Sequence, residues 1–315
     1  MRKYDFDVIV LGGGPAGLTA GIYLSRARVD TAILNEGTVG GQTVLTHEIA
    51  NYPGVENING YQLARIMKNQ AIRFGCTVRS NIKVTGLALT GSLKKIEINN
   101  KETYTAKAVI IASGGRSRTL NVPGEEKFKG HGISYCATCD GDFFTDQNII
   151  VVGGGNSALE EAVALTKYAK SVTVVHQFDH FQAFPHAVKE AKENPKINFI
   201  MESEIIEFLG SDKLESVKII DKKTGNVSTM KIDGVFILIG YVPNTEIFKE
   251  IIELNEKNEI IVDENLKTNI DGVYAAGDSI QKKYRQITTA VADGTIAALN
   301  TIEYLNKQKQ EPVEV

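Results

Sequence analysis

Two similar segments constrain the fold of this 315-residue chain more than any other feature. The first, VIVLGGGPAGLTAGIYLSRA, begins at Val8, and the second, IIVVGGGNSALEEAVALTKY, begins at Ile149. Each consists of an apolar strand, a glycine-rich turn and a helix in immediate succession, which is the order of a Rossmann-type dinucleotide-binding unit. We therefore interpret the chain as a duplicated nucleotide-binding fold rather than a short-period repeat.

Strand-like and helical patterns alternate along the rest of the chain. The sequence predicts strands or helices over residues 7–11, 17–26, 31–34, 60–74, 108–112, 148–152, 157–167, 171–175, 235–239, 272–275 and 287–304. This alternation is typical of α/β proteins with parallel sheets. We expect two Rossmann-like nucleotide-binding domains, the second inserted in the first. Joins that contain glycine and proline place the inserted domain at residues 118–244, and the first domain at residues 1–117 and 245–315.

Charge and hydropathy exclude several classes of partner. The formal net charge of −3 provides no basic surface for nucleic acid or for an acidic membrane. No stretch approaches the roughly 20 apolar residues that span a bilayer. The N-terminal apolar run, Val8–Leu11, is too short for a signal peptide. We expect a cytoplasmic protein that binds neither nucleic acid nor membranes.

The first glycine motif predicts a dinucleotide site because it follows a strand and opens a helix. Gly12 permits a tight turn, Gly14 lets the backbone approach a pyrophosphate, and Gly17 lets the helix pack closely on the strand. The helix N-terminus then presents free N–H groups to the phosphates. Glu36 ends the next strand, where a carboxylate can accept hydrogen bonds from a ribose. The alternative is a glycine turn that binds no ligand.

The sequence Cys136-Ala137-Thr138-Cys139 indicates redox chemistry. Two thiols at this spacing can form a small disulfide ring that is reduced and oxidised repeatedly. Asp140 follows directly and can return a proton to a leaving thiolate if burial raises its pKa. The alternative is half of a zinc site, but the third cysteine is single and the nearest histidine pair lies far outside zinc-finger spacing. We therefore predict no metal site.

Several further blocks occur in order along the chain: GGQ from Gly40, NYPG from Asn51, SYCATCDG, GGGNSALEEA, GYVPNT from Gly240, and AAGD followed by YRQ. Together with GGGPAG they resemble the bacterial low-molecular-weight thioredoxin reductases over the whole chain. This resemblance implies FAD as the cofactor and a homodimer. The implied FAD contacts are Gly12, Gly14, Gly17, Glu36, Gly41, Gln42, Asn51, Asp278, Arg285, Gln286 and Ile287.

The resemblance also implies a division of labour at the CxxC motif. Cys139 would face the flavin and accept its electrons, Cys136 would attack the disulfide of thioredoxin, and Asp140 would move protons. Phe143 and Phe144, just downstream, have two equally good interpretations, an apolar docking surface or part of the core.

The second glycine motif lacks the residues that recognise a nicotinamide dinucleotide. In NADPH-dependent relatives the segment after the next strand resembles H-R-R-x-x-x-R. Here the three arginine positions are occupied by Gln177, Phe178 and Gln182. No lysine or arginine occurs from residue 171 to residue 188, and no acidic residue ends the strand to bind NADH. The chain is therefore most similar to the pyridine-nucleotide-independent subgroup, some of whose members take electrons from reduced ferredoxin.

Other functions stay open at this point. One is an NADPH-dependent thioredoxin reductase with unusual contacts to the 2′-phosphate, since the GGGNSA turn is intact. Another is a dithiol oxidase that passes electrons through FAD to oxygen. From a different class, the chain could be a redox-sensing flavoprotein that binds partners without turnover, although such a protein needs no acid beside its dithiol.

Overall fold

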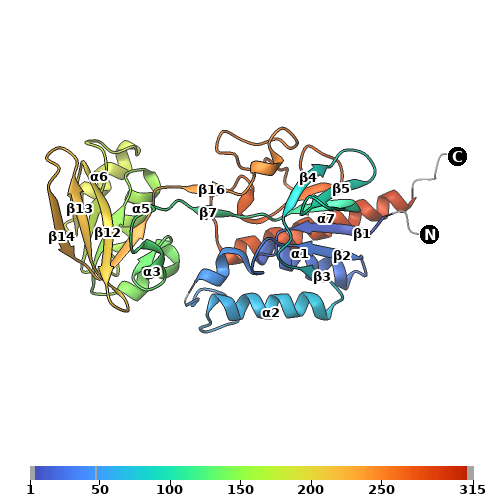
Figure 1. The fold of residues 1–315 in the computed structure, drawn as a ribbon, viewed down its shortest axis with the longest axis horizontal. Coiled ribbons are helices and arrows are strands. Elements are labelled where there is room, and N and C mark those ends of the chain that lie inside the picture. The colour runs from blue at the N-terminus through green and yellow to red at the C-terminus, as the bar shows by residue number, and fades with distance from the viewer. Residues whose placement is uncertain (1–3, 47, 311–315) are drawn as a thin grey trace. The chain divides into compact units, whose positions relative to one another are not determined.

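The computed structural model describes residues 4–46 and 48–310, and divides the chain into two compact units. Unit 1 consists of Met1–Arg116 and Val242–Val315, and unit 2 of Ser117–Tyr241. The two segments that connect the units, β7 (Gly115–Ser117) and β16 (Tyr241–Pro243), pair as a two-stranded sheet (Figure 1). Along the described residues no helix is both long and apolar enough to cross a membrane.

Unit 1 is built on a seven-stranded sheet of order β3-β2-β1-β6-β5-β4, in which β17 also pairs with β6. Its parallel part contains β1 (Phe6–Leu11), β2 (Thr31–Leu34), β3 (Thr77–Arg79), the second half of β6 (Glu102–Ile111) and β17 (Val273–Ala275). The strands β4 (Val84–Ala88) and β5 (Lys94–Ile98) form an antiparallel extension on the first half of β6. The centre of β1 is fully buried, as expected for a parallel strand covered on both faces.

Three helices accompany this sheet: α1 (Pro15–Arg26), α2 (Gly60–Arg73) and the long C-terminal α7 (Ile287–Gln310). The helix α1 packs against both α7 and α2 (Figure 1). Short 3-10 turns, η1 (Gly41–Leu45), η3 (Glu246–Phe248) and η4 (Gly277–Ser279), lie in the connections. Proline occupies the first turn of α1, where its missing N–H costs nothing.

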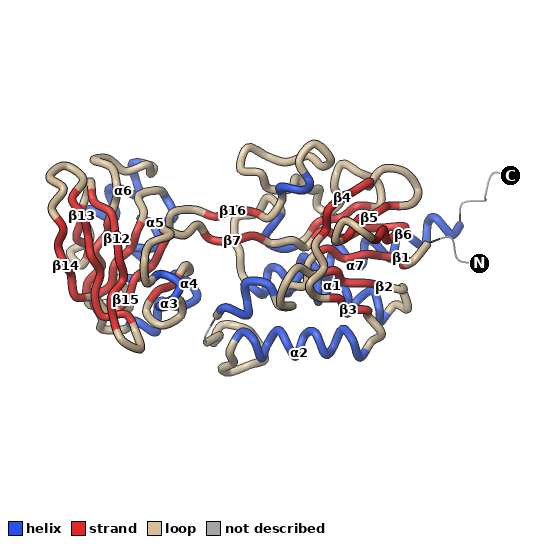
Figure 2. Tube along the Cα trace, in the orientation of Figure 1, coloured by secondary structure: helices blue, strands red, loops and turns tan. Residues whose placement is uncertain are grey.

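Unit 2 repeats the parallel architecture. Its five-stranded sheet has the order β11-β10-β9-β15-β8, from β8 (Ile133–Ser134), β9 (Asn148–Val152), β10 (Ser171–Val175), β11 (Ile197–Ile200) and β15 (Gly234–Ile237). Its helices are α3 (Glu125–Phe128), α4 (Ala137–Asp140), α5 (Asn156–Leu165) and α6 (Pro185–Glu193), with the 3-10 turn η2 at Gly141–Phe144. An antiparallel sheet of β12 (Ser203–Gly210), β13 (Leu214–Asp221) and β14 (Val227–Lys231) covers one side (Figure 2).

The predicted α/β class with Rossmann-like sheets is confirmed. In unit 1 the strands β1, β2 and β3 lie side by side in that order, and in unit 2 the strands β9, β10 and β11 do the same. This shared order is expected of a duplicated unit. The sequence interpretation omitted the antiparallel strands β4, β5 and β12–β14. These strands are partly exposed, and β14 is exposed along most of its length, so they lack the continuous apolar run that marks the buried parallel strands.

Candidate functional site: a glycine cradle and a redox disulfide

The first glycine turn brings backbone atoms so close together that side chains cannot fit. A Cβ on Gly12 would lie 2.2 Å from the carbonyl oxygen of Ala112, and one on Gly17 would lie 1.9 Å from the carbonyl oxygen of Gly12. Gly12 also has φ +113°, a backbone conformation that favours glycine. Gly14 is the N-cap of α1 and no side chain caps this helix, so the N–H groups that follow Pro15 in its first turn are left for a ligand.

A second glycine loop lies against the first. The N–H of Gly40 donates to the carbonyl of Gly13 over 2.8 Å. A Cβ on Gly41 would lie 3.2 Å from the Cα of Gly14. The two loops therefore form one cradle, which a side chain on either glycine would fill. Such a cradle at an uncapped helix N-terminus suits the pyrophosphate of a dinucleotide, and it fits FAD.

Asn35 is a residue of this cradle that the sequence interpretation missed. Its Oδ1 accepts a hydrogen bond from the N–H of Gly13 at 2.8 Å, and its Nδ2 donates to the carbonyls of Glu36 and Gly37 at 3.0 Å each. The end of β2 is thereby tied to the glycine turn, and the Glu36 side chain is left exposed. The only sequence signal was a polar residue at the end of a buried strand.

The other predicted cofactor contacts lie in three places. Gly41, Gln42 and Asn51 are exposed in and after η1. Asp278 lies in η4, whose Gly277 is so close to α1 that a Cβ there would lie 2.9 Å from that of Ala16. Arg285, Gln286 and Ile287 lead into α7, which packs against η4.

Asp278 lies in η4, near the start of α1, and its pKa is raised. Burial raises its pKa, and the nearby cations Lys282 and Arg285 oppose that rise. Arg285 itself is paired with the buried Glu259. Asp293 of α7, another residue that the sequence did not single out, accepts the N–H of Gly277 at 3.1 Å and so fixes η4.

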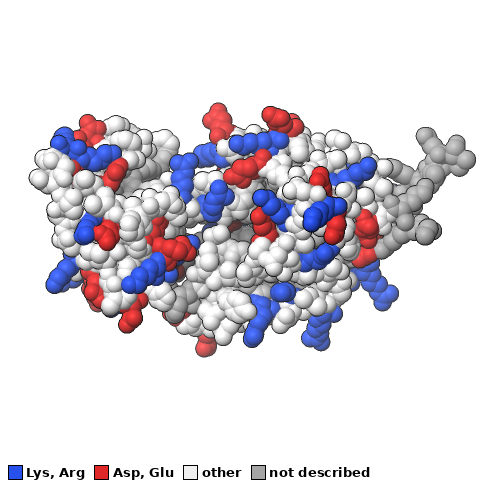
Figure 3. Space-filling view, in the orientation of Figure 1, with Lys and Arg blue, Asp and Glu red and all other residues white. Residues whose placement is uncertain are grey.

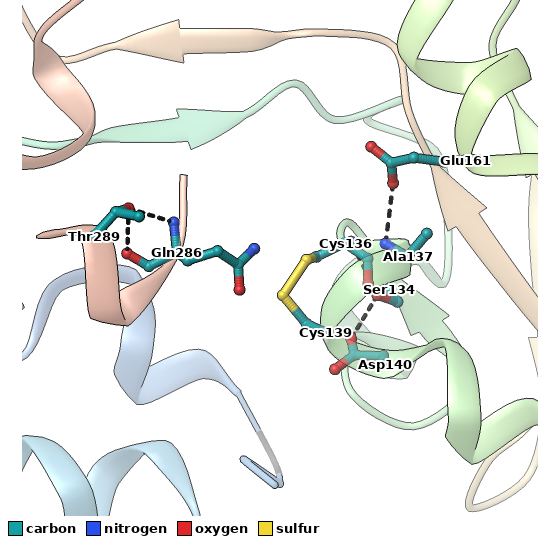
Figure 4. The surroundings of a disulfide bond; sticks show 8 residues. All are labelled: Ser134, Cys136, Ala137, Cys139, Asp140, Glu161, Gln286 and Thr289. Carbon is teal, nitrogen blue, oxygen red and sulfur yellow. Dashed lines mark hydrogen bonds between the residues drawn. A yellow bond between two sulfur atoms is a disulfide. The ribbon is translucent and has the colours of Figure 1, made fainter. Parts of the chain in front are cut away.

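In unit 2, Cys136 and Cys139 form a disulfide with a Cα–Cα distance of 5.3 Å (Figure 4). Cys136 is the N-cap of α4, and its carbonyl accepts the N–H groups of Cys139 and Asp140 at 3.3 and 3.2 Å. The two sulfurs are thus joined across a single closed turn. The third cysteine, Cys76, is buried in unit 1, where burial raises its pKa to about 11 and leaves it an inert thiol.

Asp140 has the raised pKa that a proton donor beside the disulfide requires. Burial raises its pKa, the charge of Asp142 adds to the rise, and a hydrogen bond from Ser134 opposes it. The Ser134 hydroxyl donates to Oδ2 of Asp140 at 2.5 Å and accepts the N–H of Cys136 at 3.1 Å (Figure 4). Ser134 therefore connects the acid to the CxxC turn, a role that its place two residues before Cys136 did not reveal.

The two phenylalanines after the motif have different surroundings. Phe144 packs edge-to-face on Phe236, with ring centroids 5.1 Å apart, and belongs to the core of unit 2. Phe143 is 38% exposed. The core interpretation therefore holds for Phe144, and only Phe143 is available to a partner.

The second glycine turn is covered by the loop that follows β10. The ring of His176 lies over Gly154, where an added Cβ would be 2.3 Å from the ring Cε1. The N–H of Gln182 donates to the carbonyl of Gly154 at 2.8 Å, and Gln182 forms a β-bridge with Gly155. The loop that should recognise a 2′-phosphate thus lies directly against the turn that should bind a pyrophosphate.

That loop contributes no cation. The side chains of Gln177, Phe178 and Gln182 are exposed, and none carries a charge. Lys223, on the turn between β13 and β14, acts electrostatically on Asp179 of the loop but is already paired with Glu202 at 2.5 Å. A phosphate at this place would have little charge compensation.

Known proteins with similar sequences and structures match almost the whole length of this chain. The family described as "Pyridine nucleotide-disulphide oxidoreductase" matches residues 6–294. A Clostridium pasteurianum protein described as "34.2 kDa protein in rubredoxin operon" is 43% identical, over 96% of this chain and 98% of that protein. The thioredoxin reductase of Peptoclostridium acidaminophilum is 42% identical, over 97% and 99% of the two chains. The crystal structure of thioredoxin reductase from Streptococcus pyogenes MGAS5005 superimposes with a TM-score of 0.93 at 42% identity, covering 96% and 98%.

Proposed function

Because the chain belongs to the thioredoxin reductase family of pyridine nucleotide-disulphide oxidoreductases, we propose that it reduces the disulfide of a thioredoxin through Cys136 and Cys139. Proteins of this family bind FAD, and FAD is the cofactor of this chain. The observation that carries the proposal is a disulfide flanked by a half-buried acid, Asp140, on one closed turn.

We assign the FAD pyrophosphate to the cradle in unit 1. Gly12, Gly14 and Gly41 leave room for it, and Gly17 lets α1 approach. Glu36 would bind the ribose. The remaining contacts of the proposed site are Gln42, Asn51, Asp278, Arg285, Gln286 and Ile287. When bound, FAD supplies the two electrons that open the Cys136–Cys139 disulfide.

The protein side chains then perform thiol–disulfide exchange. Reduction by two electrons and two protons yields two thiols, and in the proposed route Cys139 is the sulfur that accepts the electrons of the flavin. The Cys136 thiolate attacks one sulfur of the thioredoxin disulfide, forms a mixed disulfide and releases a thiolate, to which Asp140 delivers a proton. Cys139 then attacks the Cys136 sulfur, which restores the internal disulfide and releases the second thioredoxin thiolate. The two protons lost by Cys136 and Cys139 are those that complete the thioredoxin dithiol.

Cysteine variants test this route. In Cys136→Ser we expect anaerobic flavin reduction to persist and thioredoxin turnover to be lost. In Cys139→Ser both electron transfer into the dithiol and turnover should be lost, because no thiol would face the flavin. Stopped-flow absorbance and an insulin-coupled thioredoxin assay measure the two steps. Thioredoxin turnover by either variant at more than background rate would refute the route.

We further propose reduced ferredoxin, an acidic one-electron carrier, as the electron donor. Two observations support it. The loop after β10 lacks the cations that a 2′-phosphate needs, and each charge-assisted hydrogen bond contributes about 1.5–3 kcal/mol. In unit 1, residues 57–96 contain no Asp or Glu, and lysines and arginines gather over α2 (Figure 3). Arg65 and Arg73 are exposed on this helix, whose first residue, Gly60, packs against the backbone of η1.

The second candidate is an NADPH-dependent thioredoxin reductase. It is favoured by the second glycine turn, in which Gly153 has φ +143° and Gly155 is the N-cap of α5, which has no side-chain cap. Anaerobic mixing with each donor distinguishes the two. We expect millimolar NADPH or NADH to bleach the flavin slowly or not at all, and reduced ferredoxin to bleach it and support turnover. Rapid bleaching that saturates at micromolar NADPH would establish the second candidate instead.

We also propose a homodimer that acts in the cytoplasm, as the resemblance implies. Exposed apolar side chains on unit 1 support the dimer, among them Ile296 and Leu299 of α7, which are 40% and 51% exposed. Light scattering coupled to size exclusion tests it: a monomer mass at micromolar concentration would exclude the dimer.

A further inference from the structure

A second, half-buried carboxyl group lies near the redox disulfide on the opposite side to Asp140 (Figure 4). Glu161 belongs to α5, and its Oε2 accepts the N–H of Ala137 at 3.1 Å (Figure 4). Ala137 is the first residue of α4 and follows Cys136 in the chain. The helix α5, which follows the second glycine turn, is thereby joined to the start of the CxxC turn. The proposed thiol–disulfide exchange makes no use of this group.

The surroundings of Glu161 differ from those of its neighbour Glu160. Glu160 is exposed, whereas Glu161 is only partly exposed, and no lysine or arginine of the described chain forms an ion pair with it. Burial raises the pKa of Glu161, the charge of Glu160 adds to the rise, and the bond from Ala137 opposes it. A carboxylate at this place without a paired cation costs free energy, which a neutral side chain that accepts the same N–H would avoid.

We propose that Glu161 is a positioning residue that holds the CxxC turn and makes the reduced dithiol a stronger electron donor. The inference rests on the proposed function. A negative charge next to the backbone of Cys136 disfavours a second negative charge on the Cys136 sulfur. Stabilising the reduced form of a dithiol makes its disulfide more oxidising, so disfavouring the thiolate has the opposite effect. Glu161 therefore makes the transfer of electrons from the dithiol to a disulfide substrate more favourable.

The test compares Glu161→Gln with Glu160→Gln. Glutamine retains an oxygen that can accept the Ala137 N–H but removes the charge, and the control removes the same charge one residue away on the exposed side. FAD-loaded enzyme is equilibrated with dithiothreitol redox buffers, and the fraction of dithiol is measured by thiol alkylation and mass spectrometry. We expect Glu161→Gln to favour the dithiol by about three- to tenfold, where tenfold corresponds to about 30 mV for a two-electron couple. We expect Glu160→Gln to cause no shift toward the dithiol, and we expect Cys136 in Glu161→Gln to be alkylated faster at neutral pH.

Equal behaviour of the two variants, or a shift toward the disulfide in Glu161→Gln, would overturn the proposal and leave Glu161 a structural contact. Glu161→Asp retains the charge on a shorter side chain. It should keep the wild-type equilibrium, and it decides the question if the glutamine variant does not fold: a dithiol-favouring shift in Glu161→Asp would contradict the role of charge. The redox titration requires neither thioredoxin nor ferredoxin, so it gives its answer even if the protein fails to reduce thioredoxin.

Discussion

At the scale of single residues, the hydrogen bonds around the disulfide come from side chains outside the four-residue CxxC motif. Ser134 links Asp140 to the N–H of Cys136, and Glu161 receives the N–H of Ala137. Both carboxyl groups have pKa values raised by burial. The motif therefore provides the sulfur atoms, and the surrounding unit determines the acidity of the groups beside them.

This arrangement predicts opposite effects of Asp140→Asn on stability and on activity. Because burial raises the pKa of Asp140 above its ordinary value of 3.8, the folded state disfavours the ionised form. The stability that Asp140 contributes is fully present below pH 3.8 and is lost as the pH rises through the raised value. Asparagine removes that loss, so we expect Asp140→Asn to be about 1 kcal/mol more stable at pH 7 in urea unfolding.

The same variant should reduce thioredoxin at least tenfold more slowly, because a neutral amide cannot deliver a proton to the leaving thiolate. Asp146→Asn removes an exposed carboxylate just beyond η2; it is the matched control and should change neither quantity appreciably. An Asp140→Asn enzyme with normal turnover would exclude Asp140 as the proton donor.

At the scale of secondary-structure elements, the two strand–turn–helix units have the same backbone design but different chemistry. In unit 1, Asn35 at the end of β2 holds the glycine turn open toward exposed loops. In unit 2, the loop after β10 crosses the turn and bonds to Gly154 through Gln182. A glycine turn therefore specifies the backbone path of a nucleotide site, while the strand-end loop determines which nucleotide can bind.

We predict that restoring the missing arginines confers NADPH binding. The variant Gln177→Arg, Phe178→Arg, Gln182→Arg places guanidinium groups on the loop that contacts the turn. Two productive bonds to a 2′-phosphate contribute about 3 kcal/mol or more, so NADPH should bind at least a hundredfold more tightly than to the wild type. Titration calorimetry measures the affinity, and NADH, which lacks the 2′-phosphate, is the control ligand. An equal gain for NADH and NADPH would show that the added charge acts without recognising the phosphate.

At the scale of the whole molecule, charge is distributed unevenly along a chain with a formal net charge of −3. Residues 57–96 of unit 1 contain lysines and arginines but no Asp or Glu. They include α2, which packs on the loop proposed to hold the cofactor. Such a local field attracts an acidic partner even when the net charge of the molecule repels it, and salt weakens this attraction.

If α2 receives the acidic carrier, Arg65→Glu with Arg73→Glu should slow flavin reduction by ferredoxin about tenfold or more at low ionic strength. The difference should shrink at high salt, and reduction by dithionite should be unaffected. Lys189→Glu with Lys192→Glu on α6 reverses the same charge in unit 2 and serves as the control. Stopped-flow rates measured over a salt series give the comparison. Equal slowing by both double variants would place the docking surface elsewhere.

Much of the architecture follows from contiguous sequence. The strands 31–34, 148–152 and 171–175 are predicted with the bounds that the structure has, because each is a short apolar run that ends at a turn. The glycine motifs and CxxC are equally local, since turn geometry and ring closure involve only neighbouring residues. The antiparallel strands were missed because their partly exposed pattern contains no continuous apolar run, although consecutive strands pair with one another.

The residues that tune the sites depend on tertiary structure. Asn35 contacts a turn 22 positions earlier in the chain, and Glu161 contacts one 24 positions earlier. Neither contact leaves a periodic signal in the sequence, because each hydrogen bond joins a single side chain to a backbone N–H of a distant segment. The raised pKa values of Asp140 and Glu161 likewise arise from burial, which is a property of the packed unit. The sequence thus determines the type of chemistry, through residues that act locally, and the packing of distant segments determines the strength of the acids beside the disulfide.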